Sequence, residues 1–136
     1  MCDRQKDLCL YRYNNAIDTL EAARLCCDNK HYKDTINRCY YAAFYAVKAV
    51  LALESVDFRR HKDVIAYFNQ HYVAADIFPR DMGRKLGKLK QKRETSDYDD
   101  FYIASLEEAQ EQIAAVVEII KNVKSFLADK EIFESR

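Results

Sequence analysis

The scarcity of glycine and proline constrains the fold of this chain more than any other feature of its sequence. Only two glycines and one proline occur among 136 residues, so the chain holds few of the residues that hairpin turns need. Alanine, leucine, lysine and glutamate, which favour helices, are plentiful. We therefore predict an all-α protein. A chain of this length with 49% hydrophobic residues is about the size of one domain with one core.

Apolar residues recur at helical spacing in several segments. Two long helices are predicted first, one ending near Asn29 and one running from about Tyr32 to Leu53. The second is apolar over most of its circumference, which is typical of a central helix covered on several sides. A shorter helix is expected around residues 64–72, where the apolar positions are fewer.

The two remaining helices begin at recognisable residues. Pro79 is suited to open a fourth helix, which we expect to run to about Arg93. Ser105 followed by Glu108 is a capping-box arrangement ahead of a periodic apolar series, so the last helix begins there. An antiparallel up-and-down bundle of four long helices and one shorter helix accounts for the chain.

The charges of the chain cancel, with 22 basic and 22 acidic side chains, so no global field draws it toward nucleic acid or membrane. The longest apolar run, residues 39–53, is shorter than the roughly 20 residues that a spanning helix needs, and it carries Lys48. The first residues lack the apolar core of a signal peptide, and the five cysteines form no C-x-x-C pair. We expect free thiols in a cytoplasmic protein with no membrane contact and no cofactor.

Residues 80–93 form a cationic strip, with seven basic side chains and a single acid. Arg84, Lys88 and Lys92 are spaced to share one helix face, which would suit a phosphate backbone. The alternative is that these side chains complement the helix dipole and keep one face solvated.

An acidic and phenolic run follows the cationic strip. Asp97, Asp99 and Asp100 could cap the next helix or balance the strip electrostatically. Carboxylates at this spacing could also hold a divalent metal, but no second cluster of Asp, Glu or His supports such a site. No metal is therefore predicted.

The second helix carries charge and phenol together on one face. Arg38, Tyr41, Tyr45 and Lys48 follow one another at i, i+3, i+7 and i+10, so we expect them to line up. His61, at the start of the third helix, could face the same cleft as Arg38 and Tyr41.

Four segments follow one another in the chain: "YKDTINRCYYAAFYAVKAVLAL", "RRHKDVIAYF", "PRDMGRKLGKLKQKRETSDYDDFY" and "SLEEAQEQIAAVVEIIKNVKSFL". In this order they resemble the HEPN domain, over about residues 8–127. The resemblance is to the branch with Arg-x-Tyr-Tyr-Ala-Ala, here beginning at Arg38, and a later Arg-x4-Tyr, here from Arg93 to Tyr98. It implies a single HEPN-like domain over residues 1–136.

The resemblance also implies a function. HEPN domains are up-and-down bundles that usually dimerise, and the dimer brings two R-x4-6-H motifs together as a metal-independent ribonuclease site. Many act as toxins or defence proteins beside a minimal nucleotidyltransferase that serves as antitoxin, in some cases by adding AMP to a tyrosine just beyond the motif histidine. A homodimer and a nucleotidyltransferase partner are therefore implied for this chain.

The ribonuclease motif is incomplete in this chain. Arg93 matches its arginine, but the position five residues on is Tyr98, and no histidine follows within reach. A tyrosine, with a pKa of about 10, is a poor base at pH 7, whereas Arg93 could still hold a phosphate. His61 is the candidate to replace the missing histidine. Tyr98 and Tyr102 are candidate positions for modification.

Three interpretations remain open. In the first, a catalytically degenerate HEPN protein binds RNA or a nucleotide in a basic dimer cleft, as the helical component of a toxin–antitoxin or defence pair with a minimal nucleotidyltransferase. In the second, the chain is an active metal-independent endoribonuclease with Arg93, Tyr98 and His61 as catalytic candidates. In the third, it is a non-catalytic helical interaction module. The candidate binding residues are Arg38, Tyr41, Arg84, Lys88, Lys92 and Asp97.

Overall fold

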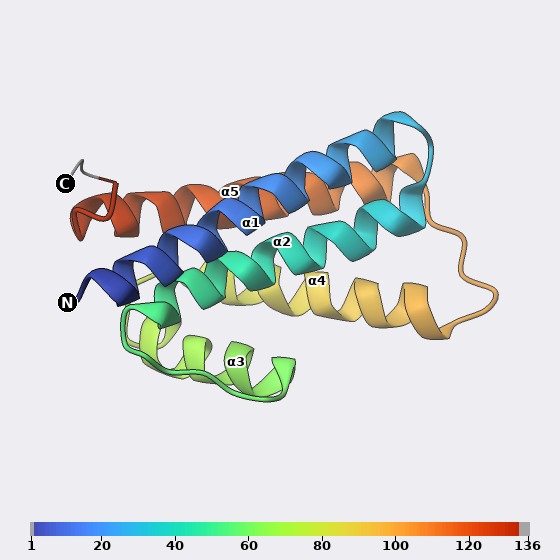
Figure 1. Cartoon of the computed structure of the whole chain (residues 1–136). Helices are drawn as coiled ribbons and strands as arrows, with labels where there is room; N and C mark the ends of the chain where they lie inside the picture. Colours follow the sequence, from blue (N-terminus) through green and yellow to red (C-terminus); the bar gives the residue numbers. More distant parts are fainter. Residues whose placement is uncertain (1, 134–136) are drawn as a thin grey trace.

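A computed structural model describes residues 2–133, which fold into helices joined by short connections (Figure 1). The elements are, in order, α1 (Asp3–Asp28), α2 (Tyr32–Ala52), α3 (His61–Phe68), the π-helical turn η1 (Asn69–Val73), α4 (Arg80–Tyr98) and α5 (Leu106–Asp129). No strand occurs within the described residues. The predicted all-α bundle of four long helices and one short helix is confirmed.

The second helix, α2, is the centre of the molecule, as its apolar circumference predicted. It packs against α1, α3, α4 and α5, and thirteen of its 21 residues are buried. Ala42, Ala43, Ala46 and Ala49 are at most 1% exposed, and their small side chains let the neighbouring helices approach closely. Figure 1 shows α1 and α5 along one side of α2, with α4 and the short α3 on the other.

The fourth helix corrects one expectation, because α4 runs to Tyr98 and does not stop near Arg93. Arg93 pairs with Asp97 one turn later, with 3.3 Å between Nη1 and Oδ2, and such i,i+4 pairs support a helix. Ser96 is 3% exposed, so the buried side of the helix continues past Arg93. The change from basic to acidic residues marks charge pairing along one helix, not the end of that helix.

The last helix begins where the sequence predicted. The Ser105 hydroxyl accepts a hydrogen bond from the Glu108 backbone N–H at 3.1 Å, which caps α5. The Glu108 carboxylate accepts hydrogen bonds from Lys92 Nζ, at 2.9 Å, and from the Tyr102 hydroxyl. These contacts tie α4 and the α4–α5 loop (residues 99–105) to the first turn of α5.

No helix within residues 2–133 is long and apolar enough to cross a membrane. The cysteines of this range are free thiols. Burial raises the pKa of Cys9 and of Cys39 to about 12, so both thiols stay protonated at neutral pH.

Candidate functional site

Tyr40 and Tyr41 form the base of the candidate site, on α2. Their rings meet edge to face, with centroids 5.2 Å apart. Tyr40 is 2% exposed, whereas Tyr41 is partly exposed. Burial raises the pKa of Tyr40, so its hydroxyl keeps its proton at neutral pH. The pair offers an aromatic surface on which cationic side chains can stack.

Arg93 reaches this surface from α4. Its guanidinium carbon lies 4.6 Å from the centroid of the Tyr40 ring and 5.7 Å from that of Tyr41. Its Nη1 faces the Asp97 carboxylate, and the side chain is only 16% exposed. The Arg93 Nε and the Tyr40 hydroxyl are buried without a hydrogen-bond partner among the described residues. Arg93 is therefore held in place mainly by aromatic stacking and one carboxylate.

His61 reaches the same tyrosines from the start of α3. Its ring centroid lies 4.1 Å from that of Phe44, 5.7 Å from Tyr41 and 6.4 Å from Tyr40. Partial burial lowers the pKa of His61, and the positive charges of Arg93 and Lys48 lower it further. The imidazole is thus mostly neutral at pH 7 and can accept a proton.

Arg38 completes the cationic surround of the tyrosine pair. Its guanidinium carbon lies 5.7 Å from the Tyr41 ring centroid, one turn earlier on α2. Nε and Nη2 both donate to Asn37 Oδ1, at 3.2 and 2.7 Å. This cluster, called the Arg93 site below, consists of Arg38, Tyr40, Tyr41, His61 and Arg93.

The structure brings together several of the residues singled out in the sequence. Arg38, Tyr41, His61 and Arg93 meet although they come from three helices, and Asp97 joins them through its ion pair with Arg93. The sequence analysis did not name Tyr40 as a site residue, although it is the first tyrosine of the Arg-x-Tyr-Tyr-Ala-Ala pattern that begins at Arg38.

Tyr98 lies outside the Arg93 site. It follows Arg93 by five residues, which places it about 140° around the helix axis, and it is 80% exposed. Tyr102 differs, because it is partly buried and its hydroxyl donates to Glu108. Of these two tyrosines, Tyr98 has the more accessible hydroxyl.

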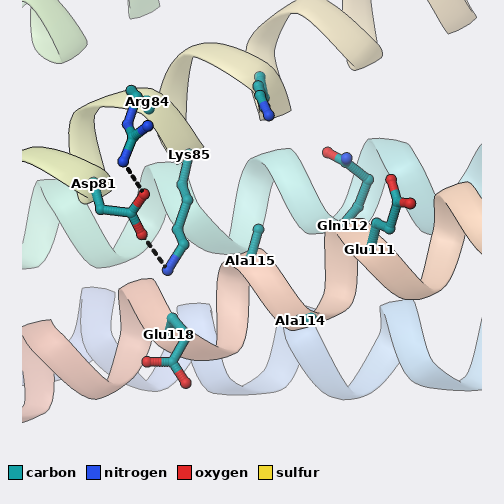
Figure 2. Close-up of a pocket in the computed structure, with 9 residues that line it drawn as sticks. Asp81, Arg84, Lys85, Glu111, Gln112, Ala114, Ala115 and Glu118 are labelled. Carbon is teal, nitrogen blue, oxygen red and sulfur yellow. Dashed lines mark hydrogen bonds and ion pairs between the residues drawn. The ribbon is translucent and has the colours of Figure 1, made fainter.

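Three members of the cationic strip, Arg84, Lys85 and Lys88, face a different part of the molecule from Arg93. Arg84, Lys85 and Lys88 line a groove of about 580 Å³ between α4 and α5. Figure 2 shows Asp81 between Arg84 and Lys85, with 2.8 Å to each, and Glu118 across the groove on α5. Arg84 and Arg93 are nine positions apart, which is about 180° around a helix.

Lys92, the third predicted member of the strip, is engaged by Glu108 and lies 6.0 Å from the Tyr102 ring centroid. It therefore holds α4 against α5. Arg84 and Lys88 line the groove, and within one chain they do not share a surface with the Arg93 site.

Within the described residues, no three His, Cys, Asp or Glu side chains lie close enough together to hold a metal ion. The chemistry of the Arg93 site is that of a cationic and aromatic surface with one neutral imidazole. Such a surface can bind a phosphate group and stack a nucleobase.

A family model for the HEPN domain matches residues 10–126, which is most of the chain. The chain belongs to the HEPN family. The resemblance seen in its sequence is thereby confirmed, and the helical bundle is the fold that the resemblance implied.

Two curated relatives and one solved structure illustrate the likeness of this HEPN chain to known proteins. A UPF0332 protein from Gloeobacter violaceus, glr0978, is 30% identical over 129 residues, covering 94% of this chain and 99% of that protein. A Methanocaldococcus jannaschii chain named "Putative toxin MJ0605" is 32% identical over 83 residues, covering 61% of this chain and 62% of that one.

The solved structure is the crystal structure of ST0689, an archaeal HEPN homologue. It superimposes with a TM-score of 0.69 over 93% of this chain and 99% of that one. The two sequences are 21% identical, so this match bears on the fold alone.

Proposed function

We propose that this HEPN protein binds RNA at the Arg93 site and acts as the helical component of a toxin–antitoxin or defence pair with a minimal nucleotidyltransferase. The observation that carries the proposal is that Arg93 of α4 and His61 of α3 lie against the same tyrosine pair. The toxin role is supported by the name of the relative from Methanocaldococcus jannaschii.

Arg93 is suited to hold a phosphate, because a guanidinium stays charged and can donate two parallel hydrogen bonds. The Tyr40 ring, 4.6 Å from the guanidinium carbon, limits how the Arg93 side chain can move. An incoming phosphate would compete with the Asp97 carboxylate for Arg93 Nη1. The distance from Nη1 to Asp97 Oδ2 is 3.3 Å, which is long for a hydrogen bond, so a phosphate that came closer would bind Nη1 more strongly.

The partly exposed Tyr41 favours single-stranded RNA as the ligand. Unpaired bases can stack on an aromatic side chain, whereas bases within a duplex are covered by their neighbours. Such stacking is worth about 1–3 kcal/mol per base. Arg38 and Arg93 flank Tyr41, and would hold the phosphates on either side of a stacked base.

A homodimer is part of the proposal. An isologous pair that met near the Arg93 site would place two such sites around one basic cleft and double the charge that faces the RNA. A monomer offers a single short site.

Metal-independent RNA cleavage is a second candidate function, which the placement of His61 favours. The 2′-hydroxyl of RNA would give its proton to the neutral imidazole and attack the adjacent phosphorus, while the 5′-oxygen leaves and takes a proton from water. Arg93 would stabilise the negative charge of the pentavalent phosphorane. In this scheme His61 takes the role of the missing motif histidine, and Tyr98 takes no part.

RNA binding can be measured by fluorescence anisotropy with a labelled single-stranded RNA. We expect Arg93→Ala to weaken binding at least ten-fold, because a charge-assisted contact and its stacking are lost. Arg84→Ala is the matched control, since Arg84 lies on the same helix but lines the groove. Circular dichroism establishes that both variants are folded. Equal affinities for the two variants would overturn the proposed site.

RNA cleavage is measured in EDTA with the same proteins and with His61→Gln. Cleavage that is lost in His61→Gln and in Arg93→Ala, but retained in a His71→Gln control, would establish the second candidate function. Binding without cleavage would support the first interpretation, in which a catalytically degenerate HEPN protein binds RNA. If the wild type neither binds nor cleaves RNA, the chain is a helical interaction module.

The nucleotidyltransferase half of the proposal makes Tyr98 the acceptor of AMP. Its hydroxyl would attack the α-phosphorus of ATP, with pyrophosphate as the leaving group. Incubation with a minimal nucleotidyltransferase encoded beside this chain, followed by mass spectrometry, tests the assignment. We expect modification to be lost in Tyr98→Phe and kept in Tyr102→Phe. Modification at Tyr102, or none, would contradict it.

A further inference from the structure

The groove between α4 and α5 has no part in the proposed function, yet a buried polar side chain without a partner lines it. Its volume of about 580 Å³ lies within the usual range for small-molecule sites. Gln112 of α5 lines this groove and is only 5% exposed. Its Oε1 is buried without a hydrogen-bond partner among the described residues. Such a buried amide would be stabilised by a ligand that supplied the missing donor.

An ion pair beyond one end of the groove shows how α4 and α5 face each other. Lys92 Nζ of α4 and Glu108 Oε2 of α5 lie 2.9 Å apart. The two helices run antiparallel, so Lys88, one turn before Lys92, comes to the level of Gln112, one turn after Glu108. At this level α5 offers a neutral amide in place of a carboxylate.

Lys88 and Glu111 leave two charges at this level without a counter-charge. Both line the groove, and neither forms an ion pair with any side chain in residues 2–133. Figure 2 shows Glu111 beside Gln112 on α5, with Gln112 extending toward α4. One level of the groove therefore combines a cation, a carboxylate and an amide that can each bind a ligand.

The composition of the groove narrows the choice of ligand. Basic and acidic side chains line it in equal number: Arg84, Lys85 and Lys88 against Asp81, Glu111 and Glu118. RNA would therefore meet as much negative as positive charge. Among the described residues that line the groove, the apolar ones are Ala114 and Ala115, whereas a protein interface has larger apolar residues at its core. A small molecule that carries both charges fits better than either macromolecule.

The head group of an α-amino acid matches the groups around Gln112. It carries a carboxylate and an ammonium on one carbon atom. The carboxylate would accept from Lys88 Nζ, and the ammonium would donate to the Glu111 carboxylate and to Gln112 Oε1. Because Oε1 is buried, the Gln112 side chain must turn toward the groove to meet the ligand.

The rest of the groove indicates which amino acid it would take. One turn from Lys88 the small Ala115 leaves space for a ligand side chain. The four remaining lining charges cancel, being those of Asp81, Arg84, Lys85 and Glu118. A charged ligand side chain therefore gains no net attraction, whereas an amide can donate to the carboxylates and accept from the cations. The side chain of glutamine is comparable in length to one helical turn of about 5.4 Å.

We propose that the α4–α5 groove binds a free α-amino acid with a neutral polar side chain, and that L-glutamine fits it best. Lys88 holds the α-carboxylate, and Glu111 and Gln112 hold the α-ammonium. The site goes beyond the proposed function and does not depend on it, because Arg93 stacks on α2, away from this groove.

Titration of the ¹⁵N-labelled full chain with L-glutamine, followed by NMR, tests the site. We expect saturable shifts of the Gln112 side-chain amide and of residues along the groove. Lys88→Gln and Glu111→Gln should each weaken binding at least ten-fold, because each removes a charge-assisted contact. Lys124→Gln is the control, since Lys124 is exposed on α5 and does not line the groove. No saturable shift, or equal affinities in all three variants, would overturn the inference.

Two analogues test the two charges of the head group separately. Glutaramic acid lacks the α-ammonium of glutamine, and 4-aminobutanamide lacks its α-carboxylate. We expect each to bind at least ten-fold more weakly than L-glutamine, and the binding of glutaramic acid to be insensitive to Glu111→Gln. An analogue that binds as tightly as L-glutamine would contradict the head-group assignment. Tighter binding of L-glutamate or L-lysine would contradict the choice of a neutral side chain.

Gln112→Leu separates a role in ligand binding from a role in packing. Leucine has a similar volume and no polar atom, so removal of an unsatisfied buried amide should leave the urea midpoint of unfolding equal or higher. The same variant should lose its response to L-glutamine. A lower midpoint, or an unchanged affinity for L-glutamine, would overturn the role assigned to Gln112.

Discussion

Arg93 has an unusual environment for a charged residue in a helical bundle. Its side chain is 16% exposed, its Nε is buried without a partner, and it stacks on Tyr40, whose hydroxyl is also unpartnered. Each unsatisfied buried polar group costs about 1–3 kcal/mol. A ligand that gave both groups a hydrogen-bond partner would remove this cost, which agrees with the proposed binding at the Arg93 site.

The titration of His61 provides a prediction for that residue. The Arg93 charge contributes to the lowered pKa of His61, so Arg93→Ala should raise that pKa toward its ordinary value of 6.5. The imidazole proton signals followed by NMR across pH give the value directly. An unchanged pKa in Arg93→Ala, or an equal rise in Arg84→Ala, would mean that the two residues do not sense each other.

The same lowered pKa makes the free energy of unfolding depend on pH. Below about pH 6.5 the unfolded chain binds a proton at His61 before the folded chain does, so stability falls as pH falls through this value and levels off below the folded pKa. In urea titrations, we expect His61→Gln to show a shallower decline with falling pH. An identical decline would assign the pH dependence to other groups.

Asp97 is expected to limit the affinity of Arg93 for phosphate. Asp97→Asn removes the carboxylate that competes for Nη1 and a negative charge that repels RNA, so binding should tighten several-fold. Anisotropy at low and moderate salt measures the change. Weaker binding would show that Asp97 positions Arg93 for its ligand.

At the scale of one element, α4 carries basic side chains on two different sides. Its inner side carries Arg93 against α2, and the side toward α5 carries Arg84 and Lys88 along the groove. One helix can separate two cationic sets in this way because residues nine apart lie about 180° around its axis. The seven basic residues that looked like one strip in the sequence therefore serve different surfaces.

The two glycines of α4 provide a matched prediction for this element. A Cβ on Gly87 would have no heavy atom within 4 Å, whereas one on Gly83 would lie 3.3 Å from Val73 Cγ1. Gly87→Ala should stabilise the protein by about 0.5–1 kcal/mol through helix propensity alone. Gly83→Ala should gain less stability, because the Val73 side chain must move to make room for the new methyl group. Urea unfolding of both variants measures the difference, and an equal gain would contradict the tight packing at Gly83.

At the scale of the whole molecule, the Arg93 site occupies one face of the bundle. It lies with the start of α3 on the side of α2 away from α1. The α4–α5 loop instead reaches the connection between α1 and α2, because Tyr102, Ile103 and Ala104 line a groove with residues 30–34. The proposed dimer, meeting near Arg93, would enclose two such sites together. The same surface would then carry both the proposed RNA site and the contact between the two copies.

That coupling predicts a concentration-dependent stability. If the native state is a dimer, a hundred-fold increase in protein concentration should raise the free energy of unfolding by about 2.7 kcal/mol and increase the midpoint of thermal unfolding. A midpoint that stays constant across the range would contradict the dimer.

Much of the fold follows from the sequence, since helix boundaries depend on local residues. The lack of glycine and proline, the apolar stripe of α2 and the Ser105 cap each act within a few residues, and the helices they predicted are present. The end of α4 was placed too early, because the sequence shows the acidic run but not the Arg93–Asp97 pair that continues the helix.

The sequence by itself determined the helical class and the family, and it singled out Arg93 as a candidate site residue. Only the tertiary structure decided which residues accompany it. His61 is 32 positions before Arg93 in the chain, and Tyr40 is 53 positions before it. These residues meet because α2, α3 and α4 pack together, and such contacts depend on long-range packing that local spacing does not specify.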